Sequence, residues 1–199
     1  MLTDGEIASL EELEAEWVRR NYETTPDPDL WKWAPTPLPR FQEMLAYATM
    51  TREMNELDHR PRFFEAGCGI GTKLYIAKYQ FGLDELGWEL FPEYIEQAKK
   101  LGVNVEQHDL RAEEPNWREY DIIFVSRPFK DDQEERNLET RIQRCMRPGA
   151  VLVSSYSAVK PYSWRWLYKG SWRIVAVKPL PGEARHTFRV EPFSPATPR

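Results

Sequence analysis

Cysteine and histidine are scarce in this 199-residue sequence, and it contains no long apolar run. The two cysteines, Cys68 and Cys145, do not suggest a disulfide framework. The three histidines are scattered without the spacing of metal ligands, so we expect no metal site. No apolar run approaches the roughly 20 residues that cross a bilayer, and no basic-then-apolar signal begins the sequence. We therefore expect a cytoplasmic protein that does not enter the membrane.

Positive charge is not in excess either, because the formal net charge is −5. This balance argues against a dedicated nucleic-acid binder. The charge is unevenly spread: residues 1–60 carry 13 acidic and 6 basic side chains, whereas residues 157–199 carry 2 and 8. The basic end is suited to an anionic partner. The apolar fraction of 41% and the charged fraction of 30% are those of a globular protein.

The first 60 residues have the pattern of a helical segment. A capping-box spacing, followed by apolar residues at every third or fourth position, predicts a helix over residues 3–17. The proline-rich stretch Pro26–Pro39 predicts an extended loop, because proline removes a backbone donor and breaks helices. A second helix is predicted from about Arg40 to Leu57. We therefore divide the chain into a helical cap on the substrate side, residues 1–60, and a main domain, residues 61–199.

From residue 62 the pattern changes to alternating strands and helices. The predicted strands are Phe63–Ala66, Glu85–Leu90, Val103–Gln107, Asp121–Val125 and Ala150–Ser155. The predicted helices are Thr72–Phe81, Pro92–Leu101 and Asp131–Arg147. Such alternation is typical of a parallel sheet with helices on both faces, and so of a three-layer α/β protein.

Beyond Ser157 the alternation stops. Trp172–Lys178 and His186–Glu191 predict two strands of a hairpin, joined by a connection that contains Pro-Leu-Pro-Gly. The preceding stretch, Lys160–Arg173, interleaves cations with aromatic residues. Aromatic rings stack on bases and cations meet phosphates, so this stretch could contact a nucleic acid. We favour the alternative, an amphipathic helix whose aromatic side chains pack on the sheet.

Glycines at alternate positions follow the first predicted strand, in the segment Glu65–Gly71 (E-A-G-C-G-I-G). Glycine permits a sharp turn and a close approach to a ligand, and the N–H groups at the following helix start face that ligand. The spacing differs from the G-x-G-x-x-G of dinucleotide turns and from the Gly-Lys-Ser/Thr of triphosphate loops. An NAD-type dehydrogenase, which shares the strand-turn-helix start, is therefore disfavoured.

Three acidic residues stand where predicted strands end. Glu65 at the start of the glycine turn can meet an amino group. Glu89 ends the second strand, where a carboxylate can accept from ribose hydroxyls, as the acidic residue of dinucleotide folds does. Asp109 follows the third strand, where it can accept from the amino group of adenine, with the backbone of Leu110 near the ring. The alternative for Glu89 and Asp109 is a solvated acid in a loop.

Residues 62–156 resemble the core of class I S-adenosylmethionine-dependent methyltransferases. E-A-G-C-G-I-G resembles the first motif of that family, G-W-E-L its acidic loop, H-D-L its adenine-contacting turn, Y-D-I-I-F-V its fourth strand and R-P-G-A-V-L-V the lead into its fifth. The resemblance implies a three-layer Rossmann-like fold with a seven-stranded, mostly parallel sheet whose C-terminal strand is antiparallel. It also implies S-adenosylmethionine as the cofactor.

The resemblance further implies which residues hold the cofactor. The glycines of the turn would pass beside the methionine part, Glu89 would hold the ribose and Asp109 the adenine. The full set of expected cofactor-binding residues is Glu65, Gly67, Cys68, Gly69, Gly71, Glu89, Leu90, Asp109, Leu110 and Ser126.

The loop after the fourth strand, Ser126-Arg127-Pro128-Phe129, resembles the Asn/Asp-Pro-Pro-aromatic loop of amino-group methyltransferases. It departs from that loop at its first two positions, so a nitrogen acceptor does not follow from it. Arg127 can bind a carboxylate or phosphate, or form a salt bridge with an acid such as Asp131 or Asp132. The residues expected around the acceptor are Arg127, Pro128, Phe129, Trp31, Trp33 and Tyr47.

The sequence thus predicts methyl transfer from S-adenosylmethionine to an unidentified acceptor: a small molecule, a protein or a nucleic acid. No general base is assigned, because alignment alone can suffice for an in-line displacement. Tyr47, His59 and His186 are only candidates for that role. The alternative is a catalytically inactive module that keeps the fold in order to bind the cofactor or a partner.

Overall fold

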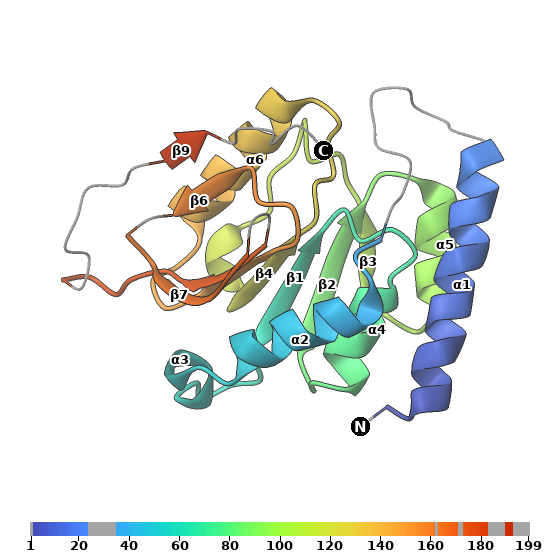
Figure 1. The fold of residues 1–199 in the computed structure, drawn as a ribbon, viewed down its shortest axis with the longest axis horizontal. Helices are drawn as coiled ribbons and strands as arrows, with labels where there is room; N and C mark the ends of the chain where they lie inside the picture. The colour runs from blue at the N-terminus through green and yellow to red at the C-terminus, as the bar shows by residue number, and fades with distance from the viewer. Residues whose placement is uncertain (1, 24–34, 162, 171–172, 183–189, 193–199) are drawn as a thin grey trace.

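A computed structural model describes residues 2–23, 35–161, 163–170, 173–182 and 190–192 (Figure 1). Its centre is a seven-stranded sheet with the order β3-β2-β1-β4-β5-β8-β7. These strands are β1 (Arg62–Ala66), β2 (Asp84–Glu89), β3 (Val105–Gln107), β4 (Ile122–Val125), β5 (Val151–Ser154), β7 (Arg165–Lys169) and β8 (Ile174–Val177). A separate two-stranded sheet joins β6 (Val159–Pro161) to β9 (Val190–Pro192).

The strand directions agree with the predicted sheet. β1 runs parallel to both β2 and β4, and β2 with β3 and β4 with β5 are parallel too. β8 is antiparallel to β5, with Leu152 opposite Ala176, and β7 pairs antiparallel with β8. The expected seven-stranded, mostly parallel sheet with an antiparallel strand is therefore confirmed. The strand order reverses between β1 and β4, which is where ligands bind in open sheets of this kind.

Helices cover both faces of the sheet (Figure 1). They are α1 (Asp4–Glu23), α2 (Leu38–Thr49), α3 (Arg52–Asn55), α4 (Thr72–Tyr79), α5 (Pro92–Lys100), α6 (Asp132–Cys145) and the 3-10 helix η1 (Trp117–Glu119). α2 packs against α4 and the β5, β7 and β8 strands, whereas α6 packs against η1 and β6. α1 lies beside α5, where Trp17 meets Tyr94 edge to face with ring centroids 5.6 Å apart (Figure 1). None of the helices in the described ranges is long and apolar enough to cross a membrane.

Two apolar clusters fill the space between the layers. Along β1, Phe63 faces the cluster beneath α2 and α4, and the next residue, Phe64, faces the cluster beneath α6. In β4, Phe124 likewise faces the cluster beneath α2 and α4, and Ile123 faces the cluster beneath α6. Because both faces are covered, each of these strands is an unbroken apolar run rather than an alternation of apolar and polar residues.

The helix predicted from Arg40 to Leu57 is interrupted. α2 ends at Thr49, and Thr51 begins α3 as an N-cap whose side chain accepts from the backbone N–H of Met54 at 3.2 Å. A threonine that bonds to the backbone in this way competes with a continuous helix. The extended loop predicted over Pro26–Pro39 ends before Leu38, where α2 begins. Pro39 lies in the first turn of that helix, where proline is tolerated.

The C-terminal predictions need a larger correction. The stretch Lys160–Arg173, expected to be a helix, contains β7, because its aromatic residues fit a pleated, half-buried surface. The expected hairpin between Trp172–Lys178 and His186–Glu191 is also wrong. β8 forms its hairpin with β7, and the strand that ends the described residues, β9, pairs with β6.

Candidate active site

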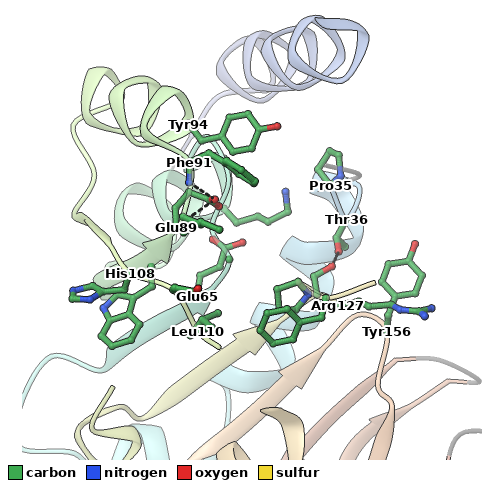
Figure 2. Close-up of a pocket in the computed structure, with 18 residues that line it drawn as sticks. Pro35, Thr36, Glu65, Glu89, Phe91, Tyr94, His108, Leu110, Arg127 and Tyr156 are labelled. Atoms are coloured by element: carbon green, nitrogen blue, oxygen red, sulfur yellow. Dashed lines mark hydrogen bonds between the residues drawn. The ribbon is translucent and has the colours of Figure 1, made fainter. Parts of the chain in front are cut away.

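A cavity of about 320 Å³ opens beyond the carboxyl ends of β1, β2, β3 and β4. Glu65, Glu89 and Asp109, which end or follow three neighbouring strands, all line it. Figure 2 shows Glu89, Phe91, Tyr94 and His108 on one side of the cavity and Pro35, Thr36, Arg127 and Tyr156 on the opposite side. The cavity therefore has an acidic side built by the first three strands and a second side built by Pro35 and Thr36, which precede α2, and by the loops after β4 and β5.

The glycine turn brings the backbone under this cavity. The N–H groups of Gly67 and Cys68 both donate to the carbonyl of Trp88 at 3.0 Å, which ties the turn to the end of β2. Gly67 has φ +73°, and a Cβ there would lie 3.0 Å from the Cβ of Pro128. Glycine is required at this position both for the left-handed backbone and for the close approach of the loop after β4.

The other residues of the turn have structural roles in the described chain. Gly71 packs on α5, because a Cβ there would lie 2.8 Å from the Cβ of Ala98. The Cys68 side chain is buried in the core against Gly87. Cys68, Gly69 and Gly71 are not among the residues that line the cavity, and their contact with a cofactor stays a prediction.

Glu89 is held rigidly by backbone donors. Its Oε2 accepts from Gly69 N at 2.7 Å, and its Oε1 accepts from Leu90 N at 2.8 Å and from Phe91 N at 3.1 Å. The bonds from Leu90 and Phe91, which line the cavity, are drawn in Figure 2. Burial raises the pKa of Glu89, and the three N–H groups oppose that rise. A carboxylate has about four acceptor positions, so the arrangement leaves capacity for a ligand hydroxyl.

Glu65 is the most perturbed acid of the cavity. Glu65 is 3% exposed, and its Oε2 atom has no hydrogen-bond partner among the residues that the structure describes. Burial raises its pKa to about 8, while the charge of Lys73 opposes the rise and the charges of Glu14 and Glu89 add to it. A buried carboxyl oxygen without a partner is costly, which makes this position a candidate for binding a hydrogen-bond donor.

Lys73 supplies the positive charge next to these acids. It lies in the first turn of α4 and lines the cavity, with its side chain 5% exposed. Its Nζ lies 2.8 Å from Oε1 of Glu14, a residue of α1 that is also buried. The N-terminal helix thereby contributes a charged side chain to the wall of the cavity.

Asp109 lies in the turn after β3, where its Oδ1 accepts from Arg111 N at 2.9 Å. Leu90 and Leu110 line the cavity beside it. His108 stacks on Trp88 with ring centroids 4.0 Å apart and an interplanar angle of 26°. This part of the cavity therefore combines apolar and flat side chains with one acceptor, which suits a heteroaromatic ring carrying an amino group.

The loop after β4 forms the opposite wall. Ser126 Oγ lies 2.9 Å from Oγ1 of Thr36, which donates to Oγ of Ser155 at 2.7 Å. Arg127 has φ +48° and forms an ion pair with Asp132, which is one of the two alternatives that the sequence left open. The backbone N–H of Phe129 donates to the buried Glu135 of α6 at 3.2 Å. The loop is thus fixed at its start by Thr36, and at its middle and end by Asp132 and Glu135 of α6.

Several candidates from the sequence lie elsewhere. Tyr47 is 42% exposed on α2 and stacks on Tyr168, and it is not among the residues that line the cavity, so its place beside the acceptor stays a prediction. His59 bonds to Asp121 at the amino end of β4, the opposite edge of the sheet, so its proposed role as a base is wrong. Trp31, Trp33 and His186 fall outside the described residues.

Sequence reasoning missed other residues that line the cavity: Pro35, Thr36, Lys73, Trp88, Phe91, Tyr94, His108 and Tyr156. Phe91, His108 and Tyr156 immediately follow predicted strands, and Lys73 follows the glycine turn. Their positions in the sequence were therefore a usable signal, because segments that follow parallel strands meet at one edge of the sheet.

No model of a protein family matches the sequence, and no curated protein matches it either. The structure is similar to an RNA methyltransferase from Salinibacter ruber in complex with S-adenosyl-L-homocysteine. The TM-score is 0.53, with 20% identity over 77% of this chain and 100% of that one. It is also similar to a variant of MtNAS in complex with S-adenosylmethionine, with a TM-score of 0.50 and 15% identity over 85% of this chain and 73% of that one. The chain therefore has the Rossmann-like fold of the class I S-adenosylmethionine-dependent methyltransferases.

Proposed function

We propose that the chain binds S-adenosylmethionine and transfers its methyl group to an acceptor. The observation that carries the proposal is that Glu65, Glu89 and Asp109, each at the end of a different parallel strand, line one cavity above a glycine turn. The complexes formed by the similar structures support this choice of ligand. A cavity of about 320 Å³ is within the range that small-molecule sites occupy.

The side chains fit the parts of this cofactor. The partnerless Oε2 of Glu65 is suited to the ammonium of the methionine part. Glu89, fixed by three backbone donors, is suited to a ribose hydroxyl. Asp109 and the apolar residues beside it are suited to the adenine ring. The three acids also match a cofactor that carries a positive sulfonium.

The bound cofactor supplies an activated methyl group for an in-line displacement. The chain's own residues would align the acceptor and exclude water. Ser126, Arg127 and Phe129 define the loop wall on the acceptor side, and Thr36 and Tyr156 extend it. This wall contains hydroxyl groups and a guanidinium already paired to Asp132. The proposed acceptor is therefore a molecule that enters between the segment before α2 and the loops after β4 and β5.

Titration calorimetry with S-adenosylmethionine and S-adenosylhomocysteine tests cofactor binding. We expect both to bind, and Glu89→Ala to weaken both at least tenfold, because the variant loses the ribose contact and the bonds to the turn. Glu93→Ala is the matched control, because Glu93 is an exposed acid on the first turn of α5. Binding of NADH in place of both ligands would contradict the proposal and support a dehydrogenase.

Turnover is tested separately with S-adenosylmethionine labelled in the methyl group. We expect the label to enter one fraction of a cell extract (small molecule, protein or nucleic acid) with the wild-type chain and not with Glu89→Ala. Cofactor binding without any label transfer would instead support the inactive module that binds the cofactor or a partner.

A further inference from the structure

A buried ion pair connects the wall of the cavity to α1. Lys73 Nζ lies 2.8 Å from Oε1 of Glu14, and the two side chains are 5% and 9% exposed. The hydroxyl of Thr72 donates to the same carboxylate oxygen at 2.5 Å. Because Lys73 also lines the cavity, its ammonium group borders both α1 and the space next to Glu65.

The position of Lys73 is unfavourable for a lysine with a purely structural role. It lies in the first turn of α4, where the helix dipole disfavours a cation, and that turn holds no acidic residue. The side chain is also buried, so the ammonium loses its hydration, and interactions with partners must offset this cost in free energy. An exposed ion pair could attach α1 without either cost. These two costs point to a ligand that uses the ammonium group.

We propose that Lys73 binds the α-carboxylate of the amino-acid end of the cofactor, and that Glu14 of α1 holds the ammonium in place. The proposal rests on the function proposed above. An ammonium has three donors and can bind two carboxylates at once. Glu65, with its buried and partnerless Oε2, faces the opposite charge of the same zwitterion. An acid and a cation in one wall match a free amino acid group, whereas a nucleoside alone offers neither charge.

A comparison of two ligands isolates the carboxylate. S-adenosylhomocysteine and its decarboxylated analogue differ only in that group, and calorimetry measures the affinity of each for the wild type and for Lys73→Met. We expect the wild type to bind S-adenosylhomocysteine about tenfold or more tightly than the analogue. Lys73→Met is expected to bind both ligands equally, with an affinity near that of the wild type for the analogue.

Two further variants separate ligand binding from the attachment of α1. Glu14→Gln keeps the lysine and is expected to keep the preference for S-adenosylhomocysteine. If Lys73 only attaches α1 to the domain, Glu14→Gln and Lys73→Met will lower the affinity for both ligands by similar factors. That result would overturn the proposal. The double variant Glu14→Gln/Lys73→Met leaves no unpaired buried charge, so it replaces Lys73→Met if thermal melting shows that the single variant is unfolded.

The outcomes also distinguish this proposal from the function on which it rests. Equal affinities of the wild type for the two ligands overturn the role of Lys73 and leave cofactor binding intact. Absence of wild-type binding to either ligand overturns cofactor binding itself, and the role of Lys73 with it.

Discussion

Glu65 combines burial with a carboxyl oxygen that accepts no hydrogen bond from the described part of the chain. In the free protein burial raises its pKa to about 8, so the carboxyl group is mostly protonated at pH 7. A ligand ammonium placed next to Oε2 would favour the charged form and lower that pKa. Ligand binding below pH 8 is then coupled to the release of a proton from this one residue.

We therefore expect binding of S-adenosylhomocysteine at pH 7 to release roughly one proton, and affinity to increase as pH rises from 6 to 8. Calorimetry in two buffers with different ionisation enthalpies measures this release. Glu65→Gln should bind more weakly and without the release. Identical binding enthalpies for the wild type in the two buffers would show that Glu65 does not change its charge.

Gly67 is a second residue whose effect can be predicted. Gly67→Ala combines a left-handed backbone with a contact of 3.0 Å to Pro128, so we expect it to lower the free energy of unfolding by about 2–4 kcal/mol. Gly82→Ala is the matched control, because it has a similar φ of +69° and no atom within 4 Å. It should lower that free energy by only about 1–2 kcal/mol.

Urea unfolding of both variants measures the difference between them. Gly67→Ala should also displace the loop after β4 and so weaken cofactor binding, whereas Gly82→Ala should not. Equal losses of stability in the two variants would mean that the approach of Pro128 imposes no constraint on the turn.

The sequence predicts single residues of the site well where the chain order determines their place. Glu89 and Asp109 were found because they follow strands, and the ends of parallel strands meet at one edge. The pairing of Lys73 with Glu14 could not be found in the same way. The two residues are 59 positions apart, and no periodic pattern indicates which face of α1 meets α4.

At the scale of elements, α6 holds the loop after β4 through a buried acid. Glu135 is 1% exposed, its Oε2 accepts from Phe129 N, and its Oε1 has no partner. Burial and the charge of Glu139 one turn later raise the pKa of Glu135 well above its usual value. The folded protein therefore favours the neutral form of Glu135, and glutamine is a close mimic of that form.

We expect Glu135→Gln to be at least as stable as the wild type at pH 7, because glutamine takes up no proton on folding. Glu135→Ala should lower the free energy of unfolding by about 1–3 kcal/mol through the orphaned Phe129 N–H. An acid with a raised folded-state pKa favours the folded state at low pH and loses this contribution as pH rises. The wild type should therefore lose stability as pH rises above the unfolded-state pKa of 4.5 and toward the raised folded-state pKa, and Glu135→Gln should lose less. Melting curves from pH 6 to 9 test this, and parallel curves for the two proteins would contradict it.

The alternation of strands and helices was predictable because the two kinds of element have different apolar periods. The strands after β5 could not be predicted in this way. Aromatic residues between cations in Arg165–Lys169 fit a helix surface as well as a strand, and only the partner β8 decides between them. The expected strand near residue 190 was found at β9, but its pairing with β6 is a long-range choice that local sequence does not encode.

At the scale of the whole molecule, α1 packs beside α5 and touches the rest of the chain mainly through a few side chains. Leu10 and Glu14 are its buried residues within the described part, and Trp17 contacts Tyr94. A helix with so little buried surface opens more readily than the strands of the central sheet. Its docking therefore depends strongly on Glu14, whose partner Lys73 lines the cavity.

We expect S-adenosylhomocysteine to slow amide hydrogen exchange in α1, although the cavity lining includes no residue of that helix. The ligand fixes Lys73, Lys73 fixes Glu14, and opening of α1 would then break a contact that the bound carboxylate supports. The decarboxylated analogue should slow α1 less than it slows the turn after β1, and Glu14→Gln should abolish the effect in α1 alone. If exchange in α1 slows equally with both ligands, the helix responds to closure of the nucleoside end, and the link through Glu14 and Lys73 is not what transmits binding to it.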